Sequence, residues 1–159
     1  MTITKLRVSN TLIGVAGVHF VVSQLSLRGL IALPTIRNTA GVDVLVSSVD
    51  GSWHANLQVK TSQNKVAFWP VGTTYDQWLG ENNYYVFVRL LPKEAGFEAF
   101  LETSNIVAKQ IQAGIDTARA QGLKDWTPCW SLPKGKIDVE RLQCQWRELG
   151  LNKVNGLGS

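Results

Sequence analysis

The sequence predicts an α/β (α+β) domain in which helices flank a central mixed sheet of about five strands. Three observations lead to this class. The segments run in the order helix, three strands, loop, two strands and two helices. An Asp50-Gly51 pair between two alternating segments is a strong β-hairpin signal. Residues 84–91, Tyr-Tyr-Val-Phe-Val-Arg-Leu-Leu, are apolar enough for a strand that is buried on both faces.

Length and composition indicate one globular domain, expected over residues 1–151, with a flexible Gly-rich tail at 152–159. The hydrophobic content of 45% and the charged content of 18% are ordinary for such a domain. No continuous apolar run approaches the ~18 residues of a membrane span, and residues 1–7 lack the apolar core of a signal peptide. We therefore expect a cytoplasmic protein without a membrane partner. Cys129 and Cys144 are expected to be reduced and structural, because neither has metal-ligand spacing.

The net charge of +4 and the isoelectric point near 9.2 permit a polyanionic partner. Many small soluble proteins are equally basic. The charge therefore gives equal support to a nucleic-acid partner and to the absence of such a partner. The charge is spread along the chain without a basic tail.

The first predicted helix covers residues 10–29. Gly14 and Gly17 are poor helix formers and cost about 1 kcal/mol each relative to alanine. Two glycines in one helix indicate the close approach of another backbone, which we expect to be the sheet that carries Asp43.

Residues 41–62 form the predicted hairpin. If Asp50-Gly51 is a two-residue loop, Asp43 lies opposite Gln58, and Lys60 follows on the same face. An acid, an amide and an amine are then expected to gather on this face. The other face carries the apolar residues, which are Val42, Val44, Val46, Ala55, Leu57 and Val59.

The remaining segments follow from turn residues and periodicity. They are a strand at 30–36 that Pro34 makes an edge strand or a short element, a short strand or extended segment at 64–69, a loop at 70–83 with a helical turn at 75–79, the strand at 84–91 with its antiparallel neighbour at 97–102, a helix at 106–122 interrupted by Gly114, an irregular stretch at 125–136 and a final helix at 139–149.

Asp43 and Gln58 supply two neighbouring oxygen ligands, which suit a hard cation such as Mg²⁺ (or Mn²⁺). The backbone carbonyl of Val59 would add a third ligand, and Lys60 would orient or deprotonate a water molecule. The competing interpretation is the solvent-facing side of a hairpin, where these residue types are common. Composition alone favours that second interpretation.

His19 and His54 are the only histidines, and no Cys or His lies at ligand spacing from them, so a zinc site is not predicted. The chain has neither a Walker sequence nor a Gly-x-Ser-x-Gly elbow. A Ser-His-Asp triad stays open, because triads are set by space and not by sequence.

Gly41-Val42-Asp43 followed by Gln58-Val59-Lys60-Thr61-Ser62 resembles the PD-(D/E)xK nuclease superfamily, in particular small stand-alone bacterial members with an Asp…Gln-x-Lys motif. The resemblance extends over most of the chain. It implies a restriction-endonuclease-like core, helix–three strands–helix–strand, and Mg²⁺-dependent hydrolysis of phosphodiester bonds in DNA. By position, Asp43 would be the principal metal ligand, Gln58 would replace the second acid, and Lys60 would position the attacking water.

The chain departs from this family on the first helix. The family often carries a Glu in a context like Gly-x-x-Gly-Glu, and Val18 stands at that position here. His19 is next along, but it is expected to point about 100° away around the helix. Two alternatives follow: a Mg²⁺-dependent DNA endonuclease or a degenerate relative of one, and an inactive module that binds nucleic acid or a protein. DNA is the expected partner, and a homodimer is one expected assembly.

Overall fold

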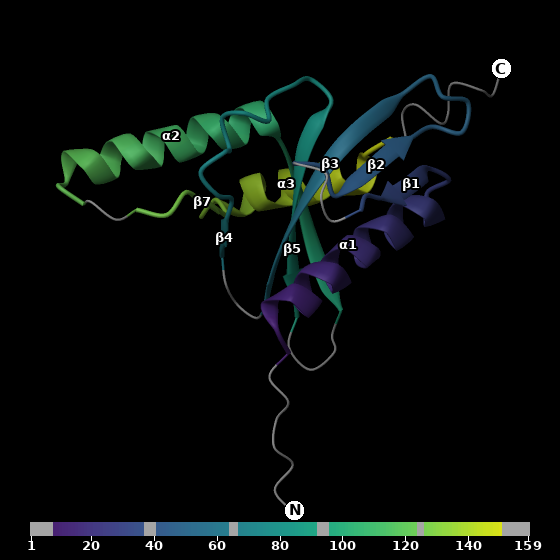
Figure 1. The fold of residues 1–159 in the computed structure, drawn as a ribbon, viewed down its shortest axis with the longest axis horizontal. Coiled ribbons are helices and arrows are strands. Elements are labelled where there is room, and N and C mark those ends of the chain that lie inside the picture. Colours follow the sequence, from purple (N-terminus) through teal and green to yellow (C-terminus); the bar gives the residue numbers. More distant parts are fainter. Residues whose placement is uncertain (1–7, 37–40, 64–66, 92–95, 124–125, 151–159) are drawn as a thin grey trace, which may run out of the picture.

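A mixed sheet of five strands forms the centre of the computed structural model, which describes residues 8–36, 41–63, 67–91, 96–123 and 126–150 (Figure 1). In chain order the elements are α1 (Asn10–Leu27), β1 (Ile31–Pro34), β2 (Val44–Ser47), β3 (His54–Gln63), β4 (Phe68–Pro70), β5 (Asn83–Leu90), β6 (Phe97–Thr103), α2 (Ser104–Ala120), β7 (Cys129–Ser131) and α3 (Lys136–Glu148). The sheet order is β1-β2-β3-β5-β6, with β3 and β5 parallel and the other neighbours antiparallel. The predicted class, the mixed sheet and its number of strands are confirmed. The predicted tail at 152–159 lies outside the described residues.

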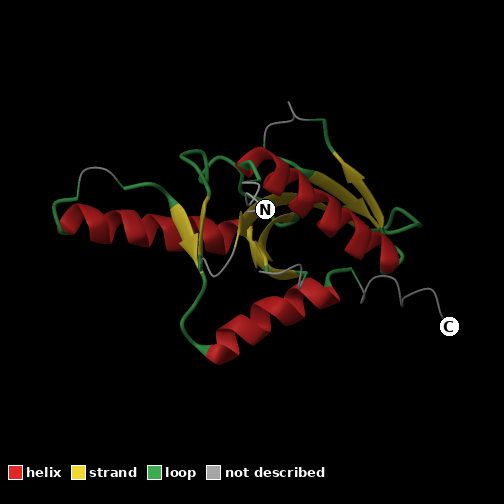
Figure 2. Cartoon of the chain, turned by 90° about the horizontal axis from the view of Figure 1, so that it is seen from below, coloured by secondary structure: helices red, strands yellow, loops and turns green. Residues whose placement is uncertain are grey.

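The sheet separates two hydrophobic cores, and β5 serves both. Val86 and Val88 face the core under α1, while Tyr85 and Phe87 face the core under α2, and all four are buried. This arrangement explains the apolar run of β5, because an interior strand with both faces covered needs no polar side. α3 lies along β6 and supplies Trp146 to the first core and Leu142 to the second. Figure 2 shows the helices arranged around the sheet.

Helix α1 begins one residue after Ser9, whose hydroxyl accepts a hydrogen bond from the Leu12 amide. The predicted close approach is confirmed at Gly17, where an added Cβ would lie 1.8 Å from Thr61 Oγ1 on β3. The neighbour is therefore a side chain and not a backbone. Gly14 has nothing within 4 Å of such a Cβ, so its predicted contact with the sheet is wrong.

Helix α1 is one helix of the described residues that is long enough to span a membrane, although the sequence has no continuous apolar run of that length. By length and composition, its 18 residues are apolar enough to cross a membrane, although no apolar run in it is continuous. Core helices pass the same test, and α1 buries a stripe of side chains at four-residue spacing against the sheet. These residues are Ile13, Gly17, Val21 and Leu25. The cytoplasmic location stays a prediction.

The connection between β3 and β5 departs from the restriction-endonuclease-like core that the resemblance implies. That core has a helix here, whereas the described residues 67–82 contain β4 and turns at 73–77. The helical turn predicted at 75–79 is thus a hydrogen-bonded turn, closed from the Gln77 amide to the Thr74 carbonyl.

The stretch predicted as irregular at 125–136 contains β7, which pairs with β4 in a separate two-stranded ribbon. The side chains of Trp69 and Trp130 bury this ribbon in the second core, with ring centroids 5.6 Å apart. Gly114 does not interrupt α2, because the ring of Trp126 packs where a Cβ would be. The final helix begins at Lys136, three residues earlier than predicted.

Candidate active site

The register of the β2–β3 hairpin is the predicted one, although its loop is longer. Val44 pairs with Leu57 and Ser47 with His54, as the predicted count requires, but the count stops at Asp43, whose amide donates to the Leu57 carbonyl. The Ser48 amide donates to the Trp53 carbonyl, which leaves residues 49–52 as the loop. The predicted two-residue loop and the observed loop share one centre, and the register is therefore unchanged.

Asp50 organises this loop. Its carboxylate accepts hydrogen bonds from the Ser48 hydroxyl at 2.6 Å and from the Ser52 amide at 3.1 Å. These bonds hold the pKa of the Asp50 carboxyl below its usual range. The hairpin signal thus has a physical basis in an aspartate that bonds the turn closed.

Asp43 ends the ladder between β2 and β3. Its amide donates to the carbonyl of Leu57 at 2.8 Å, so Asp43 and Val44 both face Leu57, as in a β-bulge. Its carboxylate Oδ2 accepts a hydrogen bond from the Val59 amide at 2.7 Å. The side chain therefore takes the place that a backbone carbonyl of β2 would have had in a continued ladder.

Thr35 holds the same strand from its other side. Its amide donates to the Asp43 carbonyl at 2.9 Å, and its hydroxyl donates to the Val42 carbonyl. The backbone of Asp43 is thus fixed by β1 and β3 together. A carboxylate supported in this way is held in one place before any ligand arrives.

Beyond Asp43, β3 continues without β2 beside it. The Val59 amide points toward β2, and in an extended strand the carbonyl of a residue points to the same side as its amide. The Val59 carbonyl therefore points into the space beside the Asp43 carboxylate. Two oxygen atoms, one charged, border this space.

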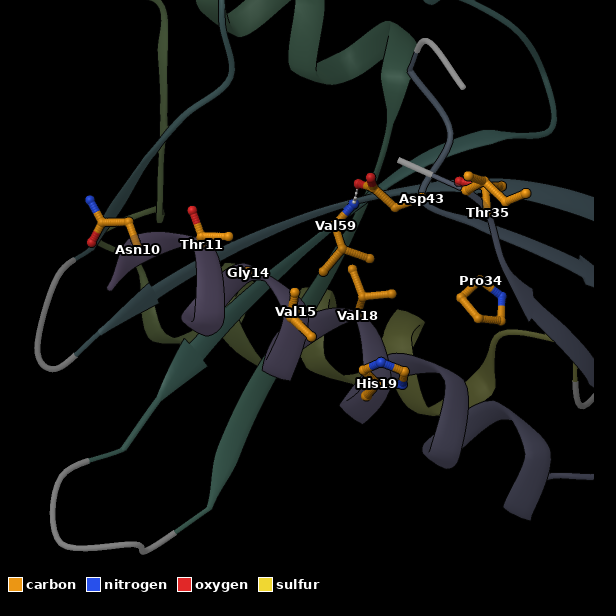
Figure 3. A pocket seen from close by; sticks show the side chains of 11 residues that line it. Asn10, Thr11, Gly14, Val15, Val18, His19, Pro34, Thr35, Asp43 and Val59 are labelled. Atoms are coloured by element: carbon orange, nitrogen blue, oxygen red, sulfur yellow. Dashed lines mark hydrogen bonds between the residues drawn. The ribbon is translucent and has the colours of Figure 1, made fainter. Parts of the chain in front are cut away.

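A pocket of about 450 Å³ occupies this space (Figure 3). One wall is the N-terminal half of α1, another is residues 34–36, and the third carries Asp43 and Val59. Gly14 leaves room in the α1 wall, because nothing lies within 4 Å of its missing Cβ. The pocket is therefore the gap that the separation of β2 from β3 opens in front of α1.

The predicted site residues divide between the two sides of β3. Asp43 and Val59 line the pocket, together with Val18. Gln58 and Lys60 alternate with Val59 and so point to the opposite side, next to Tyr85 and Phe87 of β5. The predicted gathering of Asp43, Gln58 and Lys60 on one face thus differs from the structure, because the bulge turns Asp43 toward Val59.

Lys60 still lies within the electrostatic reach of Asp43. Burial lowers the pKa of Lys60, and the Asp43 carboxylate raises it back in part. A half-buried ammonium group that feels one carboxylate gives up its proton more readily than an exposed lysine. The charge of Asp43 therefore acts on Lys60, although the two side chains lie on different sides of the strand.

Trp78, a tryptophan in a loop that the sequence predicts either to cap the core or to stack on bases, packs against the second core beside the site. It packs edge-on to Tyr85 with ring centroids 5.0 Å apart, and a Cβ on Gly41 would lie 2.8 Å from its Cδ1. Gly41 has φ of +79°, so both its conformation and its contact with Trp78 require glycine. Trp78 thus supports the backbone two residues before Asp43, and its position in a loop gave no periodic signal.

His19 also lines the pocket, although neighbouring residues such as Val18 and His19 lie about 100° apart around the helix. The residues of α1 in this wall lie at positions i, i+1, i+4, i+5, i+8 and i+9, which form a stripe two residues wide. Both 18 and 19 belong to that stripe. A helix face two residues wide, in place of a single line of residues, would have predicted that His19 lies on the same wall as Val18.

Among the described residues that line this pocket, Asp43 is the only Asp or Glu. Mg²⁺ binds through one or two carboxylates and keeps several waters or takes substrate phosphates. The Asp43 carboxylate and the Val59 carbonyl therefore fit a divalent cation whose shell is completed by water and phosphate. One carboxylate binds such a cation weakly in the absence of substrate.

Comparison of the chain with protein-family models, with curated proteins and with solved structures finds no match. The family suggested by the Asp43 and Gln58-Val59-Lys60 motif thus stays a prediction. What the site does has to be argued from its own residues.

Proposed function

We propose that this protein is a Mg²⁺-dependent hydrolase that cleaves phosphodiester bonds in DNA. The observation that carries the proposal is the Asp43 carboxylate, held where β2 and β3 separate and within electrostatic reach of Lys60. A fixed carboxylate at an open pocket and a lysine of lowered pKa on the other side of the same strand are the two groups that would serve metal-assisted phosphoryl chemistry here.

In this proposal Asp43 and the Val59 carbonyl hold Mg²⁺ or Mn²⁺. A cation held by these two groups would supply positive charge against the attacked phosphate and a more acidic water. Asp43 lines the pocket on the α1 side of β3, and its charge acts on Lys60 on the other side. DNA then approaches through the pocket, while Lys60 orients the attacking water from the other side and Gln58 provides a neutral polar group.

A restriction-endonuclease-like core is part of the proposal. It is supported by a first helix, by three consecutive antiparallel strands, and by β5 lying parallel beside β3. The β4–β7 ribbon would replace the crossover helix of that core. The proposed protein is therefore a relative whose connection between β3 and β5 has been rebuilt.

The test is nicking of supercoiled plasmid with Mg²⁺ or Mn²⁺ by the wild type, Asp43→Ala and Lys60→Ala. Asp76→Ala is a matched control, because Asp76 is an exposed aspartate in a turn outside the pocket. We expect Asp43→Ala and Lys60→Ala to lose about 100-fold or more in rate, and Asp76→Ala to match the wild type. Equal cleavage by all four proteins would assign the activity to a contaminant or to another site.

A second candidate function is favoured by Val18, an apolar residue in the wall opposite Asp43. A site with one carboxylate and a valine suits a module that binds DNA without cleaving it. This alternative predicts no cleavage with any divalent metal, together with binding that weakens steeply as salt rises. Failure to bind DNA at low salt would leave a protein-interaction role.

A further inference from the structure

The walls of the pocket beside Asp43 are largely apolar. Val15 and Val18 line it from α1, and Pro34 and Ile36 line it from the end of β1 and the residues that follow. Among the described residues that line it, none is Lys or Arg, and the one carboxylate is that of Asp43. These walls offer a phosphate group no cation, so a phosphate is expected only at the metal ion that Asp43 would hold. The rest of the pocket suits an uncharged group.

Two of these apolar side chains are open to solvent. Val15 is 45% exposed and Ile36 is 85% exposed. Figure 3 shows Val15, Val18 and Pro34 around the space in front of Asp43. Exposed apolar surface that lines a concave site is typical of a ligand pocket. The volume of about 450 Å³ also lies within the range of about 300–1,000 Å³ of pockets that bind small molecules.

Polar side chains lie along the same α1 wall. Asn10 supplies an amide, Thr11 a hydroxyl and His19 a ring nitrogen. Amides and hydroxyls both donate and accept hydrogen bonds, so they can pair with the edge of any base. Between these groups Gly14 leaves the wall flat, because nothing lies within 4 Å of its missing Cβ. A planar ring can therefore lie against the helix there, with polar partners at its edge.

We infer that this pocket binds one unpaired nucleoside of a DNA strand, and that single-stranded or locally unpaired DNA is the preferred substrate. Only one sugar joins a base to its phosphate, so a base in the pocket leaves that phosphate beside Asp43. In a duplex each base is stacked and paired, and its entry into a pocket costs free energy that is smaller for a single strand. The substrate preference rests on the proposed function, whereas the binding of a nucleoside does not.

The first test measures nucleoside binding without metal and without cleavage. Thymidine and deoxyadenosine carry no phosphate, so the Asp43 carboxylate does not repel them. Each is titrated into protein labelled with ¹³C in the valine methyl groups, and NMR follows Val15 and Val18. Val46 and Val88, which are buried in the first core, are internal references. We expect the two pocket valines to shift with a dissociation constant on the order of millimolar, and deoxyribose alone to leave them unchanged.

Gly14→Leu fills the pocket from the α1 wall, and Ala16→Leu is its matched control. Both variants introduce the same side chain into the same helix, and Ala16 is exposed and lies outside the pocket lining. We expect Gly14→Leu to lower the nucleoside affinity by about tenfold or more, and Ala16→Leu to match the wild type. Circular dichroism checks that both variants are folded.

The second test compares cleavage of one oligodeoxynucleotide as a single strand and within a duplex, with Mg²⁺ present. The wild type should cut the single strand about 10- to 100-fold faster. Gly14→Leu should lose most of this difference, and Ala16→Leu should keep it.

Nucleosides that leave the signals of Val15 and Val18 unchanged up to their solubility would overturn the inference and leave the proposed function standing. Nucleoside affinity that persists in Gly14→Leu, or equal cleavage of the single strand and the duplex, would do the same. A wild type that binds nucleosides but cleaves no DNA with any divalent metal would overturn the proposed function and leave the nucleoside site standing.

Discussion

Replacing Gly17 with alanine tests how closely α1 packs on β3. The new methyl carbon would lie 1.8 Å from Thr61 Oγ1 and 2.9 Å from Thr61 Cβ. Rotation of the threonine side chain moves Oγ1 but leaves Cβ in place, so α1 or β3 has to shift. Gly14→Ala in the same helix is the matched control, because nothing lies within 4 Å of its added carbon.

The magnitude follows from two opposing terms. Alanine stabilises a helix interior by about 1 kcal/mol relative to glycine, and this term is the same at both positions. Overpacking costs 1–3 kcal/mol in typical cores, and the short contact at Gly17 places it near about 3 kcal/mol. We therefore expect Gly14→Ala to gain about 1 kcal/mol and Gly17→Ala to lose about 2 kcal/mol. The difference of about 3 kcal/mol isolates the steric term.

Urea unfolding followed by circular dichroism measures both variants, and thermal unfolding gives a second estimate. For a domain of this size the difference corresponds to about 6–12 °C in Tm. Thr61→Ala combined with Gly17→Ala should recover part of the loss, since it removes two of the three clashing atoms. A Gly17→Ala protein as stable as Gly14→Ala would show that α1 does not pack on β3 as described.

Three further predictions concern the pocket and the cores. Val18→Glu adds a second carboxylate to the pocket beside Asp43. Mg²⁺ should therefore raise the Tm of this variant more than that of the wild type, and metal-dependent cleavage should rise about tenfold or more. An unchanged response to Mg²⁺ would argue against a metal between these two positions. Burial raises the pKa of Tyr85 to about 12. The folded state therefore keeps a proton that the unfolded chain loses above about pH 10, and the free energy of unfolding falls as pH rises toward about 12. Tyr85→Phe should remove the contribution of Tyr85 to this fall, and a pH profile identical to that of the wild type would contradict the burial of the hydroxyl. Glu102 is 2% exposed and pairs with Arg141 at 3.2 Å. Arg141→Gln leaves this buried carboxylate without its cation, so it should lower the free energy of unfolding by about 3 kcal/mol, which is more than Glu102→Gln should. Urea unfolding that ranks the two variants in the opposite order would refute this.

The hairpin register could be predicted because the error in the length of the loop does not move its centre. The Asp50-Gly51 pair does not form a two-residue loop, but the longer loop is symmetric about the same point. Pairing therefore depends only on the centre of the turn. The edge position of β1 was also predictable, since Pro34 has no amide for a ladder.

The orientation of Asp43 could not be predicted in this way. Strand alternation places it on the face of Lys60, but the bulge turns its carboxylate toward the Val59 amide. A bulge leaves no mark on the hydrophobic pattern, because it depends on which amide finds which acceptor. The β4–β7 ribbon was missed for a related reason: its strands are three residues long, and Trp69 and Trp130 meet only through the tertiary fold.

Pro34 has a consequence for solubility as well as for the pocket. It closes β1, a four-residue edge strand, and short edges that end in proline resist pairing with another chain. Three exposed apolar side chains lie beside this edge: Ile31, Leu33 and Leu45. A longer edge strand here could pair its backbone with another chain and bury these side chains in the same contact. The same ring lines the pocket in front of Asp43. Substitutions that reshape the pocket at this position therefore also remove the chain's protection against self-association.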